Sequence, residues 1–316
     1  MQQLVTGIHH ITAMCDSSQR NIDFYCGILG LRLVKKTVNF DAPDVYHFYY
    51  GDEAGAPGSI LTFFPFAGIA KGRRGKGMLN TTTFSVPTAS LSYWLQRLQR
   101  FNVNVKPPQE RFGETFLYFE DDDGLGLELV FNDADPRPPF SYGHIPLEHS
   151  IRGFFSAEIW EEGYEKTADL LTGLLDHTLI SEHENRFRFA ANDTPGSYID
   201  VLCTPDSLRA LSGGGTVHHV AFATPDKEAQ LAVRTKLMER SFNPTPILDR
   251  NYFTSIYFRE PGGVLFEIAT SGPGFAIDEP AAHLGEGLKL PPQYEPMRAE
   301  LLASLPEVSV NTDQFR

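Results

Sequence analysis

Apolar and polar positions alternate in short stretches that predict β-strands, and each group of strands contains one stretch of helical period. In residues 7–64 an apolar strand precedes a helix that begins at Asp16-Ser17-Ser18 and ends at Gly30, and three strands follow. The same β-α-β-β-β order recurs in residues 79–131, 151–203 and 216–269, with helices predicted at Ser90–Phe101, Gly163–Leu175 and Lys227–Arg240. The sequence therefore predicts four copies of one βαβββ module.

Repeated modules usually cannot bury their hydrophobic faces alone, so neighbouring copies pack together. Two βαβββ modules side by side would form a curved, cup-like sheet of eight strands. The closing strands of modules one and four align, because Thr62 lies four residues after Gly58 and Glu267 lies four residues after Gly263. We therefore expect an α+β fold in which four βαβββ modules pair into two cup-like eight-stranded curved sheets, one of them built from modules one and four.

A proline-rich stretch, DADPRPPFSYGHIPLEH at residues 133–149, is predicted to link two halves of the chain. Modules one and two would form an N-terminal half at residues 1–140, and modules three and four a C-terminal half at residues 141–270. The tail, residues 271–316, is rich in Pro and Gly before a short predicted helix at Glu295–Ser304. We expect this tail to wrap the outside or to help cover the mouth of a cup.

Two segments match familiar binding motifs only in part. GIAKGRRGKG at residues 68–77 lacks the GK[ST] ending and the strand–helix context of a phosphate-binding loop, so a flexible basic connector is predicted. The acidic turn at residues 121–124 lacks the spacing and the distal glutamate of an EF-hand. We expect a solvated turn there.

The opening strands of modules one and four carry the same pair of histidines, in GIHHITAMCD at residues 7–16 and GTVHHVAFATPD at residues 215–226. Glu267 lies within the apolar stretch VLFEI, where an unpaired charge would be costly to bury. Two imidazoles and one carboxylate are the ligands of non-haem Fe(II) oxygenases, which keep positions open for substrate and O2. Neighbouring strand residues point to opposite faces, so only one histidine of each pair can be a ligand. Modules two and three have no histidine on their opening strands, so we expect metal only in the cup of modules one and four.

Composition narrows the class of protein. The net charge of −13 and the pI of about 5.2 argue against nucleic acid and anionic membrane as partners. No apolar run is long enough to cross a bilayer, and the start of the chain lacks the basic and apolar segments of a signal peptide. Three cysteines without paired spacing encode neither a disulfide framework nor a zinc site. We expect a soluble cytoplasmic protein.

Together with RNYFTSIYFREPGGVLFE at residues 250–267 and AIDEPAAHLGEGLKLPPQYEP at residues 276–296, the histidine pairs resemble the vicinal oxygen chelate superfamily of glyoxalases and extradiol dioxygenases. Within it, the chain is most similar to bacterial hydroquinone-type ring-cleaving dioxygenases, over essentially its whole length. This resemblance implies a non-haem Fe(II) enzyme, with Mn(II) as the other candidate metal, that opens the ring of a para-diol with O2. It also implies a homo-oligomer whose partners are a small aromatic substrate and O2.

The resemblance also assigns roles by position. The second histidine of each pair and the strand glutamate become metal ligands: His10, His219 and Glu267. His9 and His218 match positions near the substrate or just outside the ligands, and Thr12, Arg250 and Tyr257 match pocket positions. Arg250 and Tyr257 would hydrogen-bond phenol oxygens, and His218 or Tyr257 would supply the acid–base group.

Two alternatives remain open at this point. A glyoxalase-type metal-dependent lyase or isomerase typically needs a fourth protein ligand, and Thr62 at the position symmetric with Glu267 argues against one. A metal-free small-molecule binding protein of the same fold is disfavoured by three intact ligand candidates. The other histidines are expected to be structural or exposed, although two in the linker could border a pocket: His47, His144, His149, His177, His183 and His283.

Overall fold

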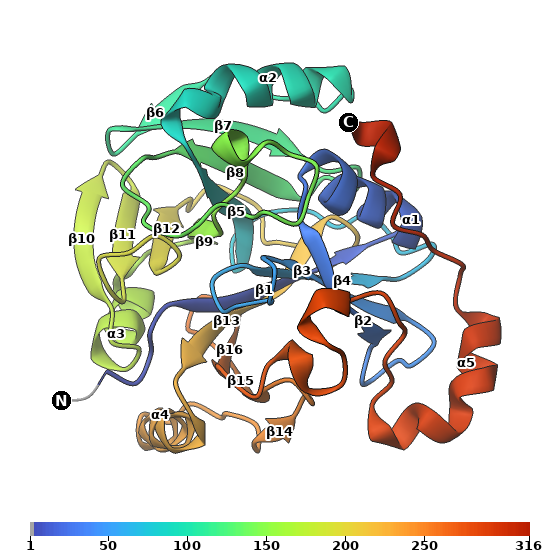
Figure 1. Ribbon diagram of the computed structural model, residues 1–316. Coiled ribbons are helices and arrows are strands. Elements are labelled where there is room, and N and C mark those ends of the chain that lie inside the picture. The colour runs from blue at the N-terminus through green and yellow to red at the C-terminus, as the bar shows by residue number, and fades with distance from the viewer. Residues whose placement is uncertain (1–2) are drawn as a thin grey trace.

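The computed structural model describes residues 3–316 and contains two eight-stranded sheets with helices around their outside (Figure 1). The first sheet has the order β14 (Leu248–Asp249), β15 (Thr254–Arg259), β16 (Leu265–Thr270), β13 (Thr216–Thr224), β1 (Ile8–Cys15), β4 (Ile60–Pro65), β3 (Tyr46–Gly51) and β2 (Arg32–Val38). The second has the order β10 (Thr178–His183), β11 (Arg186–Ala190), β12 (Tyr198–Cys203), β9 (Phe154–Glu161), β5 (Met78–Val86), β8 (Gly126–Phe131), β7 (Glu114–Glu120) and β6 (Gln109–Arg111). Modules one and four thus share the first sheet, and modules two and three share the second.

The predicted α+β fold of paired βαβββ modules is therefore confirmed. Each sheet takes one module from each predicted half of the chain, so the halves at residues 1–140 and 141–270 do not coincide with the sheets. The five α-helices within residues 3–316 are α1 (Ser18–Ile22), α2 (Leu91–Arg100), α3 (Glu165–Gly173), α4 (Lys227–Glu239) and α5 (Arg298–Ser304). A π-helical segment, Asp23–Ile28, continues α1 toward Gly30. The short edge strand β6 was not predicted, because its three residues are polar and largely exposed.

Strand register gives the first sheet an internal two-fold relation. At its centre β1 and β13 run antiparallel, with His10 opposite Ala221 and Thr12 opposite His219. Each of these strands has a parallel neighbour: Thr12 pairs with Thr62 on β4, and Ala221 pairs with Glu267 on β16. Thr62 and Glu267 therefore occupy equivalent positions, as their spacing from the preceding glycines predicted.

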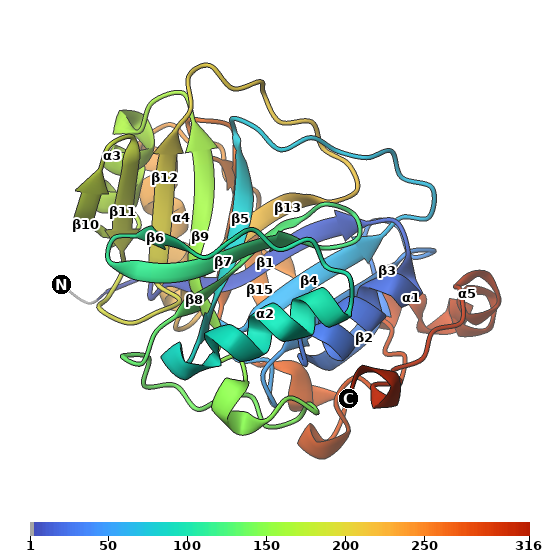
Figure 2. The ribbon, with the colours of Figure 1, turned by 90° about the horizontal axis from the view of Figure 1, so that it is seen from above.

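The basic glycine-rich segment is not a flexible connector. Its backbone pairs with the loop between β12 and β13, through bridges from Lys71 to Gly214 and from Arg73 to Leu211. Figure 2 shows these two loops running alongside each other beyond β5 and β13. The backbones approach so closely that a Cβ on Gly213 would lie 2.4 Å from the carbonyl oxygen of Ala70. The glycines serve this close contact.

The acidic turn is also more than a solvated turn. Asp121 is buried, and its carboxylate accepts hydrogen bonds from the Tyr25 hydroxyl at 2.9 Å and from the backbone N–H of Leu125 at 2.8 Å. Burial raises the pKa of Asp121 to about 6, although these hydrogen bonds oppose the rise. Asp123 accepts a hydrogen bond from the backbone N–H of Asp16. The turn thus ties module two to module one.

The tail packs into one end of the first cup. Phe275 is buried, with its ring centroid 5.1 Å from that of Tyr49 and 4.9 Å from that of Tyr252. Lys35, fully buried on β2, pairs with the carboxylates of Asp278 and Glu279. A buried ammonium is stable only with such partners, so these pairs hold the tail in place.

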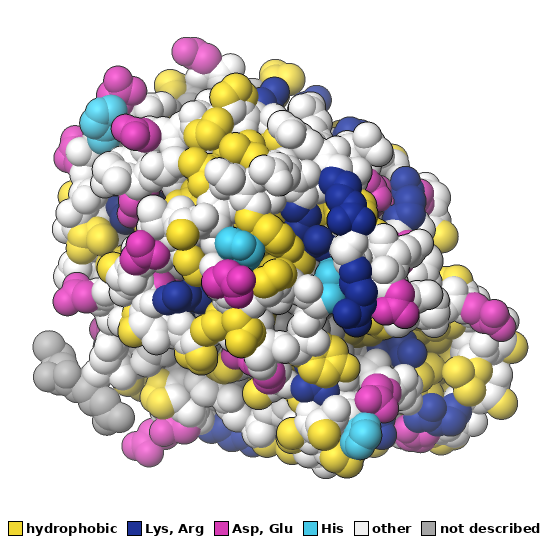
Figure 3. Space-filling model, turned by 45° about the horizontal axis from the view of Figure 1, so that its top comes forward, with side chains coloured by type: hydrophobic (Ala, Val, Ile, Leu, Met, Phe, Trp, Pro, Cys, Tyr) yellow, Lys and Arg dark blue, Asp and Glu magenta, His cyan; other side chains and the backbone are white. Residues whose placement is uncertain are grey.

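Acidic and basic side chains are interspersed over the face shown in Figure 3, with small groups of hydrophobic side chains between them. No helix within residues 3–316 is both long enough and apolar enough to span a membrane.

A buried pair of carboxyl groups joins modules three and four. Glu260, in the turn after β15, accepts hydrogen bonds from the Thr167 hydroxyl at 2.7 Å and from the backbone N–H of Val264 at 2.8 Å. The carboxyl group of Glu161, at the end of β9, lies close enough to that of Glu260 for the two groups to affect each other's ionisation. Burial, and then the charge of Glu260, raise the pKa of Glu161 to about 9, so Glu161 keeps its proton at neutral pH.

This pair predicts a loss of stability in alkali. The folded protein keeps the proton of Glu161 up to a pKa of about 9, whereas the unfolded chain releases it above pH 4.5. Between these values unfolding releases a proton, so the free energy of unfolding falls by up to about 1.4 kcal/mol per pH unit as pH rises. We expect Glu161→Gln to lose less Tm between pH 6 and pH 9 than the wild type, as measured by circular dichroism. The neighbouring Glu162→Gln, whose side chain is 84% exposed, is the control, and equal losses in all three proteins would contradict the prediction.

Candidate metal centre

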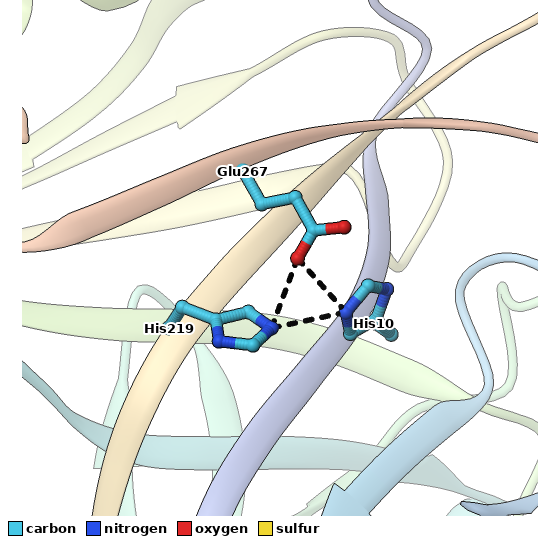
Figure 4. Close-up of side chains that lie close together, drawn as sticks. All are labelled: His10, His219 and Glu267. Carbon is cyan, nitrogen blue, oxygen red and sulfur yellow. Dashed lines mark hydrogen bonds and ion pairs between the residues drawn. The ribbon is translucent and has the colours of Figure 1, made fainter. Parts of the chain in front are cut away.

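Three buried side chains meet at the centre of the first sheet (Figure 4). His10 comes from β1, His219 from β13 and Glu267 from β16, which are neighbouring strands. The Nε2 atoms of the two histidines lie 3.1 Å apart. The Oε2 atom of Glu267 lies 3.0 Å from Nε2 of His219 and 3.3 Å from Nε2 of His10. All three side chains are at most 5% exposed.

Glu267 is an anion held in the interior. Burial alone would raise the pKa of this carboxyl, but the adjacent imidazoles of His10 and His219 hold its pKa well below the usual range. One carboxylate oxygen, Oε1, accepts a hydrogen bond from the Ser255 hydroxyl. The other, Oε2, accepts no well-aligned hydrogen bond although it is fully buried. An orphaned anionic oxygen of this kind calls for a cation.

Hydrogen bonds behind His10 set its tautomer. The carbonyl oxygen of Thr270 can only accept, so Nε2 of His9, 3.2 Å away, carries a proton. Burial lowers the pKa of His9 to about 3, so His9 is neutral and its Nδ1 is an acceptor. Nδ1 of His10, 2.9 Å from that atom, must therefore donate. Nε2 of His10 faces Glu267 and His219, so it is the ring nitrogen that can present a lone pair to a metal.

His218 stands in the same relation to His219. Their Nδ1 atoms lie 2.8 Å apart, and burial lowers the pKa of His218 to about 4, so one neutral imidazole supports the other. The outer histidine of each pair thus buttresses the inner one. His9 is enclosed behind His10, whereas His218 is partly exposed to solvent.

The spacing of the three ligand atoms suits a divalent metal. Atoms about 2.1 Å from one ion stand about 3.0 Å apart at right angles and about 3.4 Å apart at the tetrahedral angle. Two of the three observed distances, 3.0 and 3.1 Å, match the right-angled value. The third distance, 3.3 Å, lies nearer the tetrahedral value, and the three donors together fit one divalent ion.

A cavity of about 600 Å³ adjoins the cluster, because His10 and His219 are among its lining residues. Its walls are largely aromatic and come from both modules of the first sheet, including Phe40, Phe64, Phe66, Phe253 and Tyr257. A cavity of this size and lining accommodates one aromatic ring of a small molecule.

A cation–phenol pair forms one wall of this cavity. Nε of Arg250 lies 3.3 Å from the hydroxyl oxygen of Tyr257, and its guanidinium lies 5.3 Å from the ring centroid of Phe40 on the opposite module. Burial, followed by the charge of Glu267, raises the pKa of Tyr257, so this phenol stays protonated. Among the described residues that line this cavity, Arg250 is the one arginine or lysine.

A family model described as the Glyoxalase/Bleomycin resistance protein/Dioxygenase superfamily matches residues 7–129 and 156–268. The chain belongs to this superfamily. The resemblance inferred from the histidine pairs and from PGGVLFE is thereby confirmed.

Relatives within the superfamily match over nearly their full length. A Bacillus subtilis protein named "Putative ring-cleaving dioxygenase MhqO" is 44% identical over 301 residues, which are 95% of this chain and 96% of that protein. The chlorohydroquinone/hydroquinone 1,2-dioxygenase of Sphingobium indicum is 35% identical over 316 aligned residues, 96% of this chain and 97% of its own. A crystal structure of a Bacillus subtilis protein superposes with a TM-score of 0.93 at 43% identity, covering 98% of this chain and 99% of the other.

The structure places most of the predicted site residues together. His10, His219 and Glu267 converge, and Arg250, Tyr257 and His218 line the adjoining cavity. Thr12 does not line it: this residue is fully buried, with its hydroxyl 2.8 Å from that of Thr62. Thr12 lies two residues beyond His10 on β1, and there its side chain contacts Thr62 on the neighbouring strand β4.

Sequence reasoning missed several cavity residues, among them a histidine and a tyrosine on one strand. His47 and Tyr49 on β3 line the wall opposite Arg250 and are buried. His47 has no counterpart among the histidine pairs, and an aromatic stretch such as YHFYYG equally fits a strand of the core. The alternation along this strand, with Tyr49 two residues after His47, was the available signal. The linker histidines do not border the cavity: His144 contacts Arg97, and His149 stacks on Tyr93.

The second cup carries different chemistry at the same register. Thr81 and Ser156 stand where His10 and His219 stand in the first sheet, and Glu128 and Asp200 stand where Thr62 and Glu267 stand. Guanidinium groups neutralise these carboxylates, with Arg111 2.6 Å from Glu128. Within residues 3–316 the cluster of the first sheet is the one group of metal-ligating side chains.

The cluster predicts stoichiometric metal binding. After anaerobic incubation with Fe(II) and desalting, we expect about one ion per chain, because three converging ligands hold an ion that two do not. His219→Ala and Glu267→Gln should each lose most of that metal, measured by inductively coupled plasma mass spectrometry. His283→Ala removes an exposed histidine and should bind as the wild type does. Full occupancy in Glu267→Gln would contradict ligation by this carboxylate.

Proposed function

We propose that this protein is a non-haem Fe(II)-dependent ring-cleaving dioxygenase that acts on hydroquinone-type para-diols with O2. The observation that carries the proposal is a buried cluster of two imidazoles and one carboxylate that opens onto an aromatic cavity. The names of the Bacillus subtilis and Sphingobium indicum relatives support ring cleavage and a hydroquinone substrate. Mn(II) fits the same ligands and is the alternative metal.

Each part of the site has a task under this proposal. His10, His219 and Glu267 would hold the metal, and His9 with the carbonyl of Thr270 fixes the ring of His10. When bound, Fe(II) would supply open coordination positions at which a phenolate and O2 can meet and exchange electrons.

Arg250 and Tyr257 would act on the substrate oxygen nearest the metal. A guanidinium beside a phenol favours the ionised form and lowers the pKa of that phenol. Tyr257 is protonated, so its hydroxyl can donate a hydrogen bond to the phenolate while Arg250 supports it from behind. His218, partly exposed at the cavity, is placed to exchange a proton between the site and solvent.

A glyoxalase-type lyase or isomerase is the second candidate reaction on this fold. Thr62 occupies the position equivalent to Glu267, so the cluster has no second carboxylate there. The side chains that contact the Glu267 carboxylate are those of His10, His219 and Ser255, and none of them is a second carboxylate. Three ligands that leave coordination positions open favour a dioxygenase over a glyoxalase-type lyase or isomerase. They also favour a dioxygenase over a metal-free binding protein. Assembly as a homo-oligomer and a cytoplasmic location remain predictions from the sequence.

Oxygen uptake tests the reaction directly. The protein is loaded anaerobically with Fe(II) and offered hydroquinone, methylhydroquinone, chlorohydroquinone and then catechol in an oxygen-electrode cell. We expect uptake with the para-diols, and a loss on the order of 100-fold or more in His219→Ala and Glu267→Ala, because the metal is no longer held in an open site.

His283→Ala should keep the wild-type rate. If the metallated protein consumes no O2 with any diol, the dioxygenase proposal fails, and turnover of hemithioacetals would then favour the lyase. Failure to bind metal at all would instead favour a metal-free binding protein.

A further inference from the structure

The internal two-fold relation of the first sheet places two tyrosines on opposite walls of the cavity. Tyr257 on β15 pairs with Glu267 on β16, and Tyr49 on β3 pairs with Thr62 on β4. Because Thr62 and Glu267 are equivalent, Tyr49 and Tyr257 are equivalent as well. Both line the same cavity of about 600 Å³. One aromatic ligand would thus have a phenol from each module beside it.

The two phenols have different partners. The hydroxyl of Tyr257 lies beside a permanent cation, Arg250, at 3.3 Å. The hydroxyl of Tyr49 instead lies 2.9 Å from Nδ1 of His47, whose Nε2 lies 2.9 Å from the Thr62 hydroxyl. That hydroxyl continues to Thr12 at 2.8 Å, so the chain of hydrogen bonds leads from the cavity into the sheet.

The His47 branch is electrically neutral. Burial, and then the nearby imidazoles of His10 and His219, hold the pKa of His47 well below its usual value. Burial also raises the pKa of Tyr49, so its phenol keeps the proton. A neutral imidazole with two partners carries one N–H, and two proton arrangements satisfy this chain. In one the Tyr49 oxygen offers lone pairs to the cavity, and in the other its hydroxyl is free to donate.

A para-diol with one oxygen at a metal matches these two walls in charge. Its metal-side oxygen is ionised and suits the cationic pair of Arg250 and Tyr257, whereas its distal hydroxyl is neutral. The remaining polar lining residues of the described chain include Asn39, Asp41, Ser212 and Thr245, which lie outside strands. His47 and Tyr49 are instead fixed on a strand, so they can hold a hydroxyl at a defined position.

We propose that Tyr49 binds the distal, un-ionised hydroxyl of the diol and that His47 positions Tyr49 for this contact. The assignment rests on the proposed function for the identity of the ligand. The Tyr49 oxygen accepts the hydrogen bond of the distal hydroxyl while its own proton is donated to Nδ1 of His47. No proton is transferred, in keeping with the neutrality of His47. The pair therefore selects a ring with a second hydroxyl over a ring with one.

Binding without turnover tests this selection. Dissociation constants for hydroquinone and for phenol, which lacks the distal hydroxyl, are measured by titration calorimetry under anaerobic conditions with the Fe(II)-loaded full chain. We expect the wild type to bind hydroquinone about tenfold more tightly than phenol, as one buried hydrogen bond provides. In Tyr49→Phe the two dissociation constants should become about equal, with metal content and Tm close to those of the wild type.

Matched variants separate the contact from its support. Tyr46→Phe, on the same strand, removes a phenol that donates to the carbonyl of Pro306 and should keep the tenfold preference. His47→Phe should reduce the preference although Tyr49 is intact. His47→Gln, which retains a hydrogen-bonding side chain, should restore part of it, an effect that a purely packing role of His47 does not produce.

The outcomes discriminate between the two proposals. An undiminished preference for hydroquinone in Tyr49→Phe overturns the assignment of Tyr49, whatever the turnover of the wild type. Equal binding of the two ligands by the wild type overturns it as well. A wild type that prefers hydroquinone through Tyr49 and yet consumes no O2 supports the hydroxyl contact and refutes the dioxygenase reaction.

Discussion

The burial of the Glu267 carboxylate is the constraint on which the rest of the first cup depends. A lone anion between apolar strands would cost several kcal/mol, and it would then take up a proton. Here two imidazoles lie within 3.3 Å of one carboxylate oxygen, and a serine hydroxyl satisfies the other. Both imidazoles are themselves supported by outer histidines. The sheet is thus built around a negative charge that remains negative and faces an open cavity.

The second cup meets the same constraint differently. Its strands also place carboxylates, Glu128 and Asp200, at the central register, but arginines from other strands of the same sheet contact them. An arginine brings its own permanent charge, so the pair needs nothing further. The imidazoles beside Glu267 carry no permanent charge, so a metal ion can take the place of their protons. The two cups therefore differ in the groups beside the carboxylate, which are guanidinium groups in one and imidazoles in the candidate metal centre.

Much of this arrangement could be predicted from the sequence because it repeats. Matching phrases around His10 and His219, and equal glycine-to-Glu267 and glycine-to-Thr62 spacings, identify which modules pair and which residues converge. Residues that have no matching residue in another module could not be placed in this way. His47 lies in an aromatic strand that equally predicts a core, and its contact with Thr62 depends on a neighbouring strand.

The structure of segments that are stabilised by distant residues could not be predicted from local sequence patterns either. The basic glycine-rich loop is ordered by backbone pairing with residues near Gly214, more than a hundred positions away. The tail is fixed by Lys35 at the opposite end of the chain, and the burial of Asp121 depends on Tyr25. In each case the partner that decides the structure lies in another module, where spacing within a segment carries no information.

The placement of modules one and four in one sheet has a consequence for folding. β5 and β9 meet across a short separation in sequence, whereas β1 must wait for β13, about 200 residues later. During synthesis the second cup can therefore close first, while the apolar edge of β1 stays unpaired until the last third of the chain emerges. The three residues of the candidate metal centre are divided between these early and late segments. A ribosome-bound chain that ends before β13 lacks this cluster, so the proposed ion site forms only when the whole fold closes.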